Sequence, residues 1–423
     1  MRTKIALIVL VLGICFAFYW RHQEKNVSNP TTPSEIKTSE NVAPENSFNE
    51  SFVPSPVMRV SLTNSARNSF EFSSSKPCLI QTGVNDSESV TLEPVPRGGI
   101  VRAASGPQGI QLGDETYPTS LIKVIPESSP DLWVNDHQYR GEIWFHRLAS
   151  GRLVAVNHVP LEEYLGSVVD SEMPASFPDE ARKAQAIIAR TYALYRRQVT
   201  VDDPYFDLYA TTLSQQYLGV QYWANGRRLA GESLISRRLV QETTGLVCLY
   251  ENELFSTYYS AVCGGKTTHG SILFPDAVPL LQEVPCEYCS AAELYKWDRK
   301  WSLDQASEII SRAASSRGRR LGQLASVKMQ GSEAGPDTRY QFEDGRSSLT
   351  LSGQEIRNLF SGLPSPTFSL EVNGSELIFH GAGHGHGVGL CQWGARGMAM
   401  TGKQVDEILQ HYYPGVTISS YRE

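Results

Sequence analysis

The sequence predicts an α+β fold, in which strand-rich and helix-rich segments occupy different stretches of the chain. Short strand-like segments fill residues 57–157, separated by clusters of Gly, Pro, Asn or Ser. A stretch rich in Ala, Ile and Tyr follows at residues 160–199 and has helical spacing. Strand-like and helical segments then recur up to the C-terminus. The order strands, helices, strands, helices is typical of an α+β protein.

Length and composition indicate a globular protein. The 423 residues are enough for two or three domains, or for one large elongated domain. A hydrophobic content of 41% and a charged content of 20% allow a sizeable core. The formal net charge is −7, whereas proteins that bind nucleic acid carry basic surfaces. We therefore expect no nucleic-acid partner.

The N-terminal residues 1–21 are predicted to be a membrane anchor or signal segment outside the fold. Basic residues precede an apolar run from Ile5 to Trp20, which is within reach of a spanning helix and also fits the core of a signal peptide. No small-x-small cleavage site follows, so an uncleaved anchor is favoured. We expect an exported protein anchored in a bacterial cytoplasmic membrane, with a secreted or periplasmic form as the alternative. Residues 22–56 are rich in Asn, Ser, Thr, Pro and Glu and are predicted to be a disordered linker.

The exported part, residues 57–423, is predicted to be one domain built of two parts. Residues 57–157 form the β-rich part. Residues 158–423 form a mixed core with an insert at 255–295 and a helix-and-strand subdomain at 300–375. The strands predicted in the β-rich part are residues 57–63, 71–75, 90–95, 98–103, 120–125, 141–148 and 152–159.

Caps and stop signals predict the helices of the core. Residues 160–199 are predicted to form two helices joined by a short loop, with Ser176 as the N-cap of the second helix and Pro178 near its first turn. The other predicted elements are hairpin strands at 238–265, helices from Ser302 to about Ala314 and from Ser352 to near Phe360, both with capping-box spacing, and a last helix from Val405 to Tyr412.

Glu172 is a distinctive residue because it lies at the junction of the two helices predicted over 160–199. Lys183 and Arg190 follow in the second helix, about two turns apart, so they share one otherwise apolar face. Cations on an apolar stripe are costly unless they are paired or turned toward a polar cleft. A carboxylate at a helix corner with cations nearby therefore indicates a site. The alternative is an exposed loop acid with both cations reaching along the surface to water.

A second signature lies at residues 381–389, where five Gly alternate with His384, His386 and two apolar residues. Gly permits positive φ and a close approach of backbone to a ligand. The two His could hold a metal, or one could act as an acid/base or as a donor to a sugar. A phosphate cradle is disfavoured because Walker spacing is absent. A structural Gly loop around a buried, satisfied His is the alternative. Gln392 and Trp393 follow directly and pair an amide with a flat aromatic, as carbohydrate grooves do.

Together the two signatures resemble the stage II sporulation protein D family, which includes the amidase-enhancer proteins of cell-wall lysis. The matching segments follow the order of the family and extend over nearly all of the exported part. They are LEEYLGSVVDSEMP, EARKAQAIIARTYAL, SQQYLGV, GHGHGVGLCQWGA and ILQHYYPG. The resemblance implies a membrane-anchored lytic transglycosylase that cleaves peptidoglycan glycan strands between N-acetylmuramic acid and N-acetylglucosamine. It also implies a partner amidase that removes the stem peptides.

The resemblance further implies roles for single residues. Glu172 matches the catalytic acid of the family's Glu-Met-Pro motif. Lys183 and Arg190 match functionally important basic residues, and we expect them to face the substrate, because cations beside Glu172 would lower its pKa. The other residues expected to bind substrate lie in the remaining motifs and are Gln215, His386 and Gln392.

A lytic transglycosylase needs one carboxylic acid, so the chemistry agrees with a single Glu172 whose pKa is raised by burial. Asp170 and Glu163 lie nearby in the sequence, which leaves a hydrolase with a second carboxylate open. Two further alternatives are a non-catalytic enhancer of a cell-wall amidase and a zinc-dependent wall hydrolase that uses His384 and His386.

Cysteines in the insert at 255–295 indicate a structural zinc site. Cys286-x-x-Cys289, together with Cys263 and His269, provides a tetrahedral set of three Cys and one His. Some members of the family bind zinc with Cys and His in this region. The spacing here departs from theirs, so this ligand set is inferred from the residues alone. One alternative, in an oxidising compartment, is a disulfide between Cys263 and Cys286 or Cys289, and another is that these cysteines are free thiols.

Overall fold

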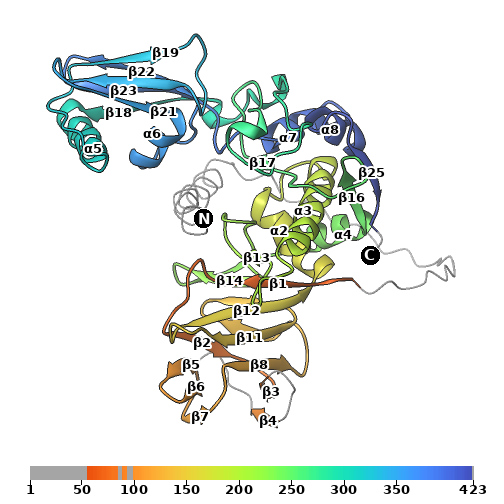
Figure 1. Cartoon of the computed structure of the whole chain (residues 1–423). Helices are drawn as coiled ribbons and strands as arrows, with labels where there is room; N and C mark the ends of the chain where they lie inside the picture. Colours follow the sequence, from red (N-terminus) through yellow and green to blue (C-terminus); the bar gives the residue numbers. More distant parts are fainter. Residues whose placement is uncertain (1–54, 84–87, 93–98, 422–423) are drawn as a thin grey trace.

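The computed structural model describes residues 55–83, 88–92 and 99–421, and Figure 1 shows it as a ribbon. The predicted anchor (1–21) and nearly all of the predicted linker lie outside these residues. The fold has a β-rich part, a mostly helical central core and a separate unit at residues 296–382, which we call the arm (Figure 1). The strand-rich beginning and the later mixture of helices and strands confirm the α+β prediction.

Two sheets build the β-rich part. Phe70 and Phe72 of the second sheet contact Phe145 of the first, with ring centroids 5.9 and 6.0 Å apart, so the two sheets share one apolar core. The first sheet has the order β13 (Leu208–Tyr209), β1 (Val57–Ser61), β12 (Leu153–Pro160), β11 (Glu142–Arg147), β8 (Leu121–Pro126), β3 (Cys78–Thr82) and β4 (Glu88–Leu92). The second has the order β15 (Arg227–Ala230), β14 (Gln221–Ala224), β10 (His137–Tyr139), β9 (Leu132–Val134), β2 (Ser69–Ser73), β5 (Val101–Gly106), β6 (Gly109–Leu112) and β7 (Glu115–Tyr117).

The central core is arranged around one long helix, α3, which contacts four other helices. Its Ala-rich sequence allows this close packing, because small side chains let neighbouring helices approach. The helices are α2 (Leu161–Glu172), α3 (Asp179–Val199), α4 (Leu234–Glu242), α7 (Gln392–Met400) and α8 (Val405–Tyr412), with short 3₁₀ turns η1 (Gly270–Ile272), η2 (Glu287–Cys289) and η3 (Glu293–Tyr295). Two small sheets join distant segments: β16 (Leu246–Leu249) with β25 (Thr417–Ser420), and β17 (Tyr259–Ser260) with β24 (Leu390–Cys391).

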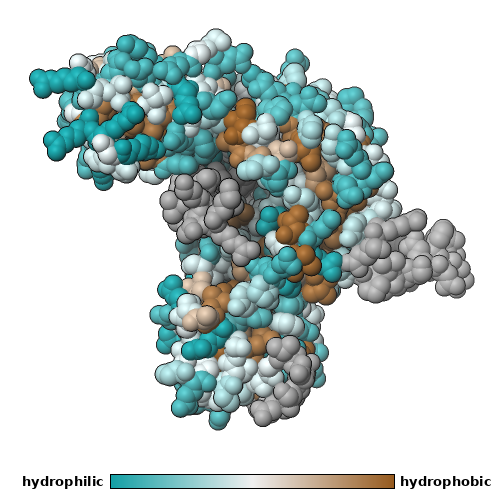
Figure 2. Space-filling model, viewed as in Figure 1, coloured by the Kyte–Doolittle hydropathy of each residue, from teal (hydrophilic) through white to brown (hydrophobic). Residues whose placement is uncertain are grey.

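The arm leaves and rejoins the core through adjacent strands, since Lys296 pairs with Ala382. It has its own hydrophobic cluster. Figures 1 and 2 show the arm and the β-rich part on either side of a recess, and the visible face of the arm is mostly hydrophilic. The arm contains β18 (Lys296–Ser302), α5 (Leu303–Ser315), β19 (Ser326–Gln330), β20 (Arg339–Glu343), β21 (Ser348–Ser352), α6 (Gly353–Leu359), β22 (Phe368–Asn373) and β23 (Glu376–Ala382).

Local helix signals were good predictors. Ser302 and Ser352 are the N-caps of α5 and α6, each in a complete capping box, and the last helix spans Val405–Tyr412 as predicted. The predicted cap at Ser176 is wrong, because α3 begins after Pro178, which takes the N-cap position without a side-chain hydrogen bond.

The hairpin predicted at residues 238–265 is wrong. Its first residues belong to α4, whose N-cap Ser233 forms a capping box and whose apolar side chains Leu239 and Val240 face the core. The remaining strands of this segment do not pair with each other, since β16 pairs with β25 and β17 pairs with β24. The sequence shows strand propensity here, but the partners lie more than a hundred residues away.

Candidate active site

Glu172 is the last residue of α2, and only 4% of its surface is exposed. The helix ends there because Pro174 forces the preceding residue into extended backbone. Glu172 Oε1 accepts a hydrogen bond of 2.7 Å from the backbone N–H of Gln216. Burial raises the pKa of Glu172 to about 7, although the Gln216 N–H and the side chains of Tyr259 and Gln392 act to lower it. A large share of this carboxyl therefore carries its proton near neutral pH.

The neighbours of Glu172 come from distant parts of the chain. Tyr259 lies in β17, and Gln392 is the first residue of α7, directly after β24. The parallel pairing of these two strands brings both side chains to the same place. Gln392 Nε2 donates to Gln185 Oε1 of α3 at 3.3 Å, while Gln392 Oε1 is buried without a hydrogen-bond partner among the described residues. An acceptor of this kind beside Glu172 suits a hydroxyl group of a bound sugar.

Gln215, which we expect to bind substrate, has its side chain hydrogen-bonded within the protein, and Tyr259 is one of its neighbours. It is fully buried, with Oε1 accepting from the Tyr164 hydroxyl at 3.1 Å and Nε2 donating to the Ala189 carbonyl at 3.4 Å. These bonds tie α2 to α3. The adjacent Gln216 is the residue that meets Glu172, through its backbone.

The two cations of α3 are paired with carboxylates of the protein, and their expected contact with substrate stays a prediction. Arg190 is fully buried, and its Nε and Nη2 donate to the two carboxylate oxygens of Glu162 at 2.8 and 2.7 Å. Its Nη1 donates to the Leu246 carbonyl at 3.0 Å. Lys183 forms ion pairs of 3.0 Å with Glu180 and with Glu242. Both cations are thus occupied by carboxylates of the protein itself.

The acidic residues near Glu172 in sequence are directed elsewhere. Asp170 pairs with the buried guanidinium of Arg182. Glu163 is exposed and lies nine residues before Glu172, about 13 Å along the helix axis. Neither carboxylate joins Glu172 in the site, whereas a two-carboxylate hydrolase would need a second acid there.

The ring of His386, in the Gly-rich loop, is hydrogen-bonded to the backbone of the loop and of β17. His386 Nδ1 accepts from the Val388 N–H at 3.0 Å, and the ring also bonds the backbone of Tyr259. Burial lowers the pKa of His386 to about 3 and that of His384 to about 4. Both rings are neutral at physiological pH. The loop packs so closely on the segment before β17 that a Cβ on Gly389 would lie 1.9 Å from the Tyr258 carbonyl oxygen.

Four buried cysteines form a cluster in the central core. Their Sγ atoms all lie within 4.8 Å of one another, and the residues are Cys263, Cys286, Cys289 and Cys391. The predicted ligand His269 is not among them, because its Nδ1 faces Ser271, with Oγ at 2.9 Å, at the start of η1. Cys391 takes the fourth position. Spacing within the insert could not identify this residue, because it lies just after the second signature, 96 residues beyond the end of the insert.

A cavity of about 290 Å³ lies between the β-rich part and the segment that contains Gln216. Of the residues described around Glu172, Gln216 lines this cavity, whereas Glu172, Tyr259 and Gln392 do not. The residues that line it are Leu62, Thr63, Arg67, Val134, Asn135, Asp136, His137, Tyr139, Ala210, Thr211, Gln216, Tyr217 and Leu218.

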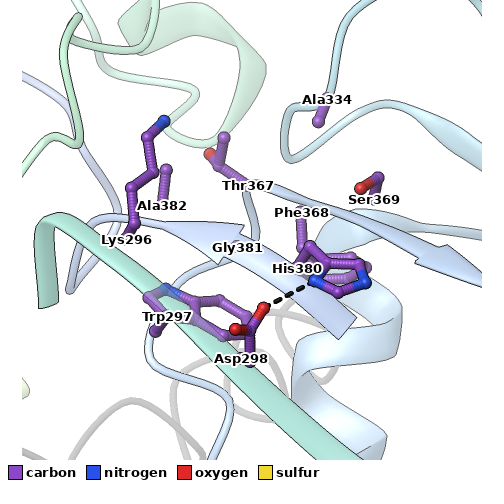
Figure 3. A pocket seen from close by; sticks show the side chains of 10 residues that line it. All are labelled: Lys296, Trp297, Asp298, Ala334, Thr367, Phe368, Ser369, His380, Gly381 and Ala382. Carbon is purple, nitrogen blue, oxygen red and sulfur yellow. Dashed lines mark hydrogen bonds and ion pairs between the residues drawn. The ribbon is translucent and has the colours of Figure 1, made fainter. Parts of the chain in front are cut away.

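A second cavity, of about 530 Å³, lies on the arm (Figure 3). Asp298 and His380 face each other there from paired strands, with Oδ1 and Nδ1 2.6 Å apart. Lys296 and Trp297 also line it, but none of the residues around Glu172 does. This cavity is separate from the candidate active site.

Comparison with known proteins places the chain in a family. A family model described as stage II sporulation protein matches residues 149–250. Stage II sporulation protein D of Bacillus subtilis is 32% identical over 285 residues, which is 63% of this chain and 76% of that protein. The chain belongs to the stage II sporulation protein D family. An uncharacterized protein of Brachyspira hyodysenteriae is 30% identical over 302 residues, covering 70% of this chain and 77% of that relative.

Two further comparisons match other parts or other relatives of this stage II sporulation protein D family member. The amidase enhancer of Bacillus subtilis is 27% identical over 302 residues, which is 61% of this chain and 40% of that protein. A domain family of unknown function matches residues 282–389, which include the whole arm. Among residues 55–83, 88–92 and 99–421 of this family member, no helix is both long and apolar enough to cross a membrane.

Sequence reasoning missed Tyr259 and Gln216 as neighbours of Glu172 in this family member. The Gln216 contact is made by the backbone N–H, so the pattern of side chains in the sequence could not predict it. Tyr259 lies in a two-residue strand that was assigned to a hairpin. A signal was present, since a tyrosine needs a partner for its hydroxyl when it is buried.

Proposed function

We propose that this protein is a peptidoglycan lytic transglycosylase, which cleaves glycan strands between N-acetylmuramic acid and N-acetylglucosamine. The observation that carries the proposal is Glu172, a buried carboxyl with a pKa of about 7 that forms no ion pair within the described part of the chain. An acid in this state can donate a proton at neutral pH and take one back. Membership of the stage II sporulation protein D family supports the assignment.

The reaction needs no second carboxylate. Glu172 gives its proton to the glycosidic oxygen as the bond between C1 of the muramic acid and that oxygen breaks. The 6-hydroxyl oxygen of the same muramic acid then closes on C1, and its proton passes to the Glu172 carboxylate. The products are a 1,6-anhydro sugar end and a free 4-hydroxyl. No water is consumed, and the acid is regenerated.

The surroundings of Glu172 fit these steps. Burial keeps the carboxyl protonated, and the Gln216 N–H stabilises the carboxylate that appears after the first transfer. Because Arg190 and Lys183 are paired with other acids, neither holds Glu172 in its ionised form. The Gln392 acceptor provides a hydrogen-bond partner for a sugar hydroxyl.

The substrate also sets the location. Peptidoglycan lies outside the cytoplasmic membrane, so the proposal includes export and anchoring through residues 1–21. The similarity to the amidase enhancer of Bacillus subtilis supports a cell-wall amidase as a partner. The same similarity favours one competing function, in which the protein is a non-catalytic enhancer of that amidase. A zinc hydrolase using His384 and His386 finds no support, because neither residue belongs to the cluster of possible metal ligands in the described part of the chain.

Digestion of purified, peptide-free glycan strands, with mass analysis of the new ends, tests the proposal. The full-length protein should release 1,6-anhydro-muramic ends. Glu172→Gln should lower the rate by about 1,000-fold, because a positioned general acid contributes roughly 100- to 10,000-fold. Glu163→Gln is the matched control, since the exposed Glu163 lies in the same helix and should leave the rate unchanged.

The other outcomes point to the competing functions. Reducing ends in place of anhydro ends would mean hydrolysis and would overturn the proposal. So would an active Glu172→Gln protein. If the wild type does not cleave, yet wild type and Glu172→Gln stimulate a wall amidase equally, the protein is an enhancer.

A further inference from the structure

The four clustered cysteines have the geometry of a closed metal site. The Sγ atoms of Cys263 and Cys289 are 3.6 Å apart. A tetrahedral zinc ion with Zn–S bonds of about 2.3 Å would have sulfur–sulfur edges of about 3.8 Å. A disulfide would bring two of the sulfurs to about 2.05 Å. We propose that Cys263, Cys286, Cys289 and Cys391 hold one structural zinc ion.

Hydrogen-bond donors are directed at the sulfurs, as expected around metal-bound thiolates. Cys391 Sγ accepts from the backbone N–H of Cys263 and of Gly394, both at 3.3 Å. The Tyr412 hydroxyl lies 3.1 Å from Cys286 Sγ. Four thiolates carry four negative charges and a zinc ion only two positive ones, so donors to sulfur stabilise the remaining charge.

Glycines at the cluster allow the segments to approach each other. A Cβ on Gly394 would lie 2.6 Å from Cys286 Sγ and 1.9 Å from the Tyr412 hydroxyl. Gly264 has φ +79°, and a Cβ there would lie 2.8 Å from the Cβ of Ala382. Only residues without a side chain fit at these two places, beside Cys391 and Cys263. The backbone around the cluster is thus arranged for the four sulfurs to meet.

The ligand set favours a soft or borderline metal ion such as zinc over a hard one. Four thiolates are soft ligands, which select zinc over calcium or magnesium, and four protein ligands leave no open coordination position. The site is therefore structural and not hydrolytic. All four residues are buried, so the ion would also be screened from solvent.

The positions of the four cysteines show which segments the zinc ion would join. Cys263 follows Tyr259 of β17 by four residues, and Cys391 immediately precedes Gln392. β17 and β24 pair in parallel, so the zinc would lock the ends of the strand pair that brings Tyr259 and Gln392 to Glu172. Cys286 and Cys289 attach the insert to the same point. This inference concerns the architecture and does not depend on the reaction that Glu172 performs.

Metal analysis of the full-length protein, purified under reducing conditions, tests the site. We expect one zinc ion per chain and tetrahedral thiolate spectra after replacement by Co²⁺. Cys391→Ser and Cys263→Ser should each lower zinc content at least tenfold. His269→Ala and Cys78→Ser are the matched controls, since His269 is the ligand that spacing suggested and Cys78 is a buried cysteine outside the cluster. Both controls should keep full zinc content.

A second measurement covers variants that fail to fold. Removal of zinc from the wild type by a chelator should raise amide hydrogen exchange at least tenfold around residues 259–264 and 390–394, while the β-rich part stays protected. The proposal is overturned if the wild type contains less than a tenth of an equivalent of zinc, or if thiol counting finds a disulfide within the cluster. Loss of zinc in His269→Ala, or unchanged exchange after chelation, would overturn it as well.

Discussion

At the scale of single residues, burial is what gives Glu172 its chemistry. The sequence located this residue through its motif and its place at a helix corner. It could not assign Arg190, because spacing shows which residues share a face and not which carboxylate lies opposite. That carboxylate belongs to Glu162 in α2, which packs on α3. Arg190 therefore joins α3 to α2, the helix that carries Glu172.

The raised pKa of Glu172 predicts a pH-dependent stability. Below pH 4.5, its ordinary pKa, both folded and unfolded chains hold the proton. Between pH 4.5 and about 7 only the folded chain keeps it, so the free energy of unfolding falls as pH rises. The total loss from this group is roughly 3 kcal/mol, at 1.36 kcal/mol per pKa unit. Glu172→Gln stays neutral and should escape this loss.

Urea unfolding at pH 4 and pH 8 measures this difference. The stability of Glu172→Gln relative to wild type should increase by roughly 3 kcal/mol between the two pH values. Glu163→Gln should show no such change, because Glu163 is exposed in both states. Parallel pH profiles for wild type and Glu172→Gln would show that burial does not raise this pKa.

At the scale of elements, the sequence predicted local structure well and distant pairing poorly. The capping boxes at Ser302 and Ser352 operate within four residues, so the helix starts were correct. β16 and β17 find their partners at the opposite end of the core, and period-two patterning carries no information about such partners. For the same reason the fourth cysteine of the cluster could not be found from spacing within the insert.

The Gly-rich loop allows a test of how tightly β24 is seated on its neighbour. Gly389 and Gly402 both have positive φ, +70° and +89°, but a Cβ on Gly389 meets the Tyr258 carbonyl at 1.9 Å, whereas a Cβ on Gly402 meets nothing within 4 Å. Gly402→Ala should cost only the backbone strain, about 1 kcal/mol. Gly389→Ala should cost more than about 3 kcal/mol, because backbone must move.

Chemical unfolding of both variants separates strain from packing. The comparison is matched because the residue change and the sign of φ are the same. Gly389→Ala should also lower glycan cleavage, since the displaced loop carries Gln392 away from Glu172. Equal free energies of unfolding for the two variants would mean that the close contact at Gly389 is relaxed in solution.

At the scale of the whole molecule, the site is assembled from segments that are adjacent only in the fold. Four residues meet there although the first and last are 220 positions apart in sequence: Glu172, Gln216, Tyr259 and Gln392. The segments of the core that carry them pack together around Glu172. In the sequence, the arm is inserted between β17 and β24, the two strands that carry Tyr259 and lead to Gln392. Because it leaves and returns through paired strands, the core can close without it.

The separate hydrophobic cluster of the arm predicts two unfolding transitions. Phe360 is fully buried in this cluster, with its ring 5.2 Å from the rings of Trp301 and of Phe379. Phe360→Ala should destabilise the arm by about 3–5 kcal/mol, the usual cost of deleting a buried aromatic ring.

Scanning calorimetry of the full-length protein should show that one transition moves to lower temperature while the other stays. Phe145→Ala, in the β-rich part, is the reciprocal control and should move the other transition. If both substitutions shift a single transition together, the arm and the core unfold as one unit, and the arm's cluster is coupled to the site in spite of its separate packing.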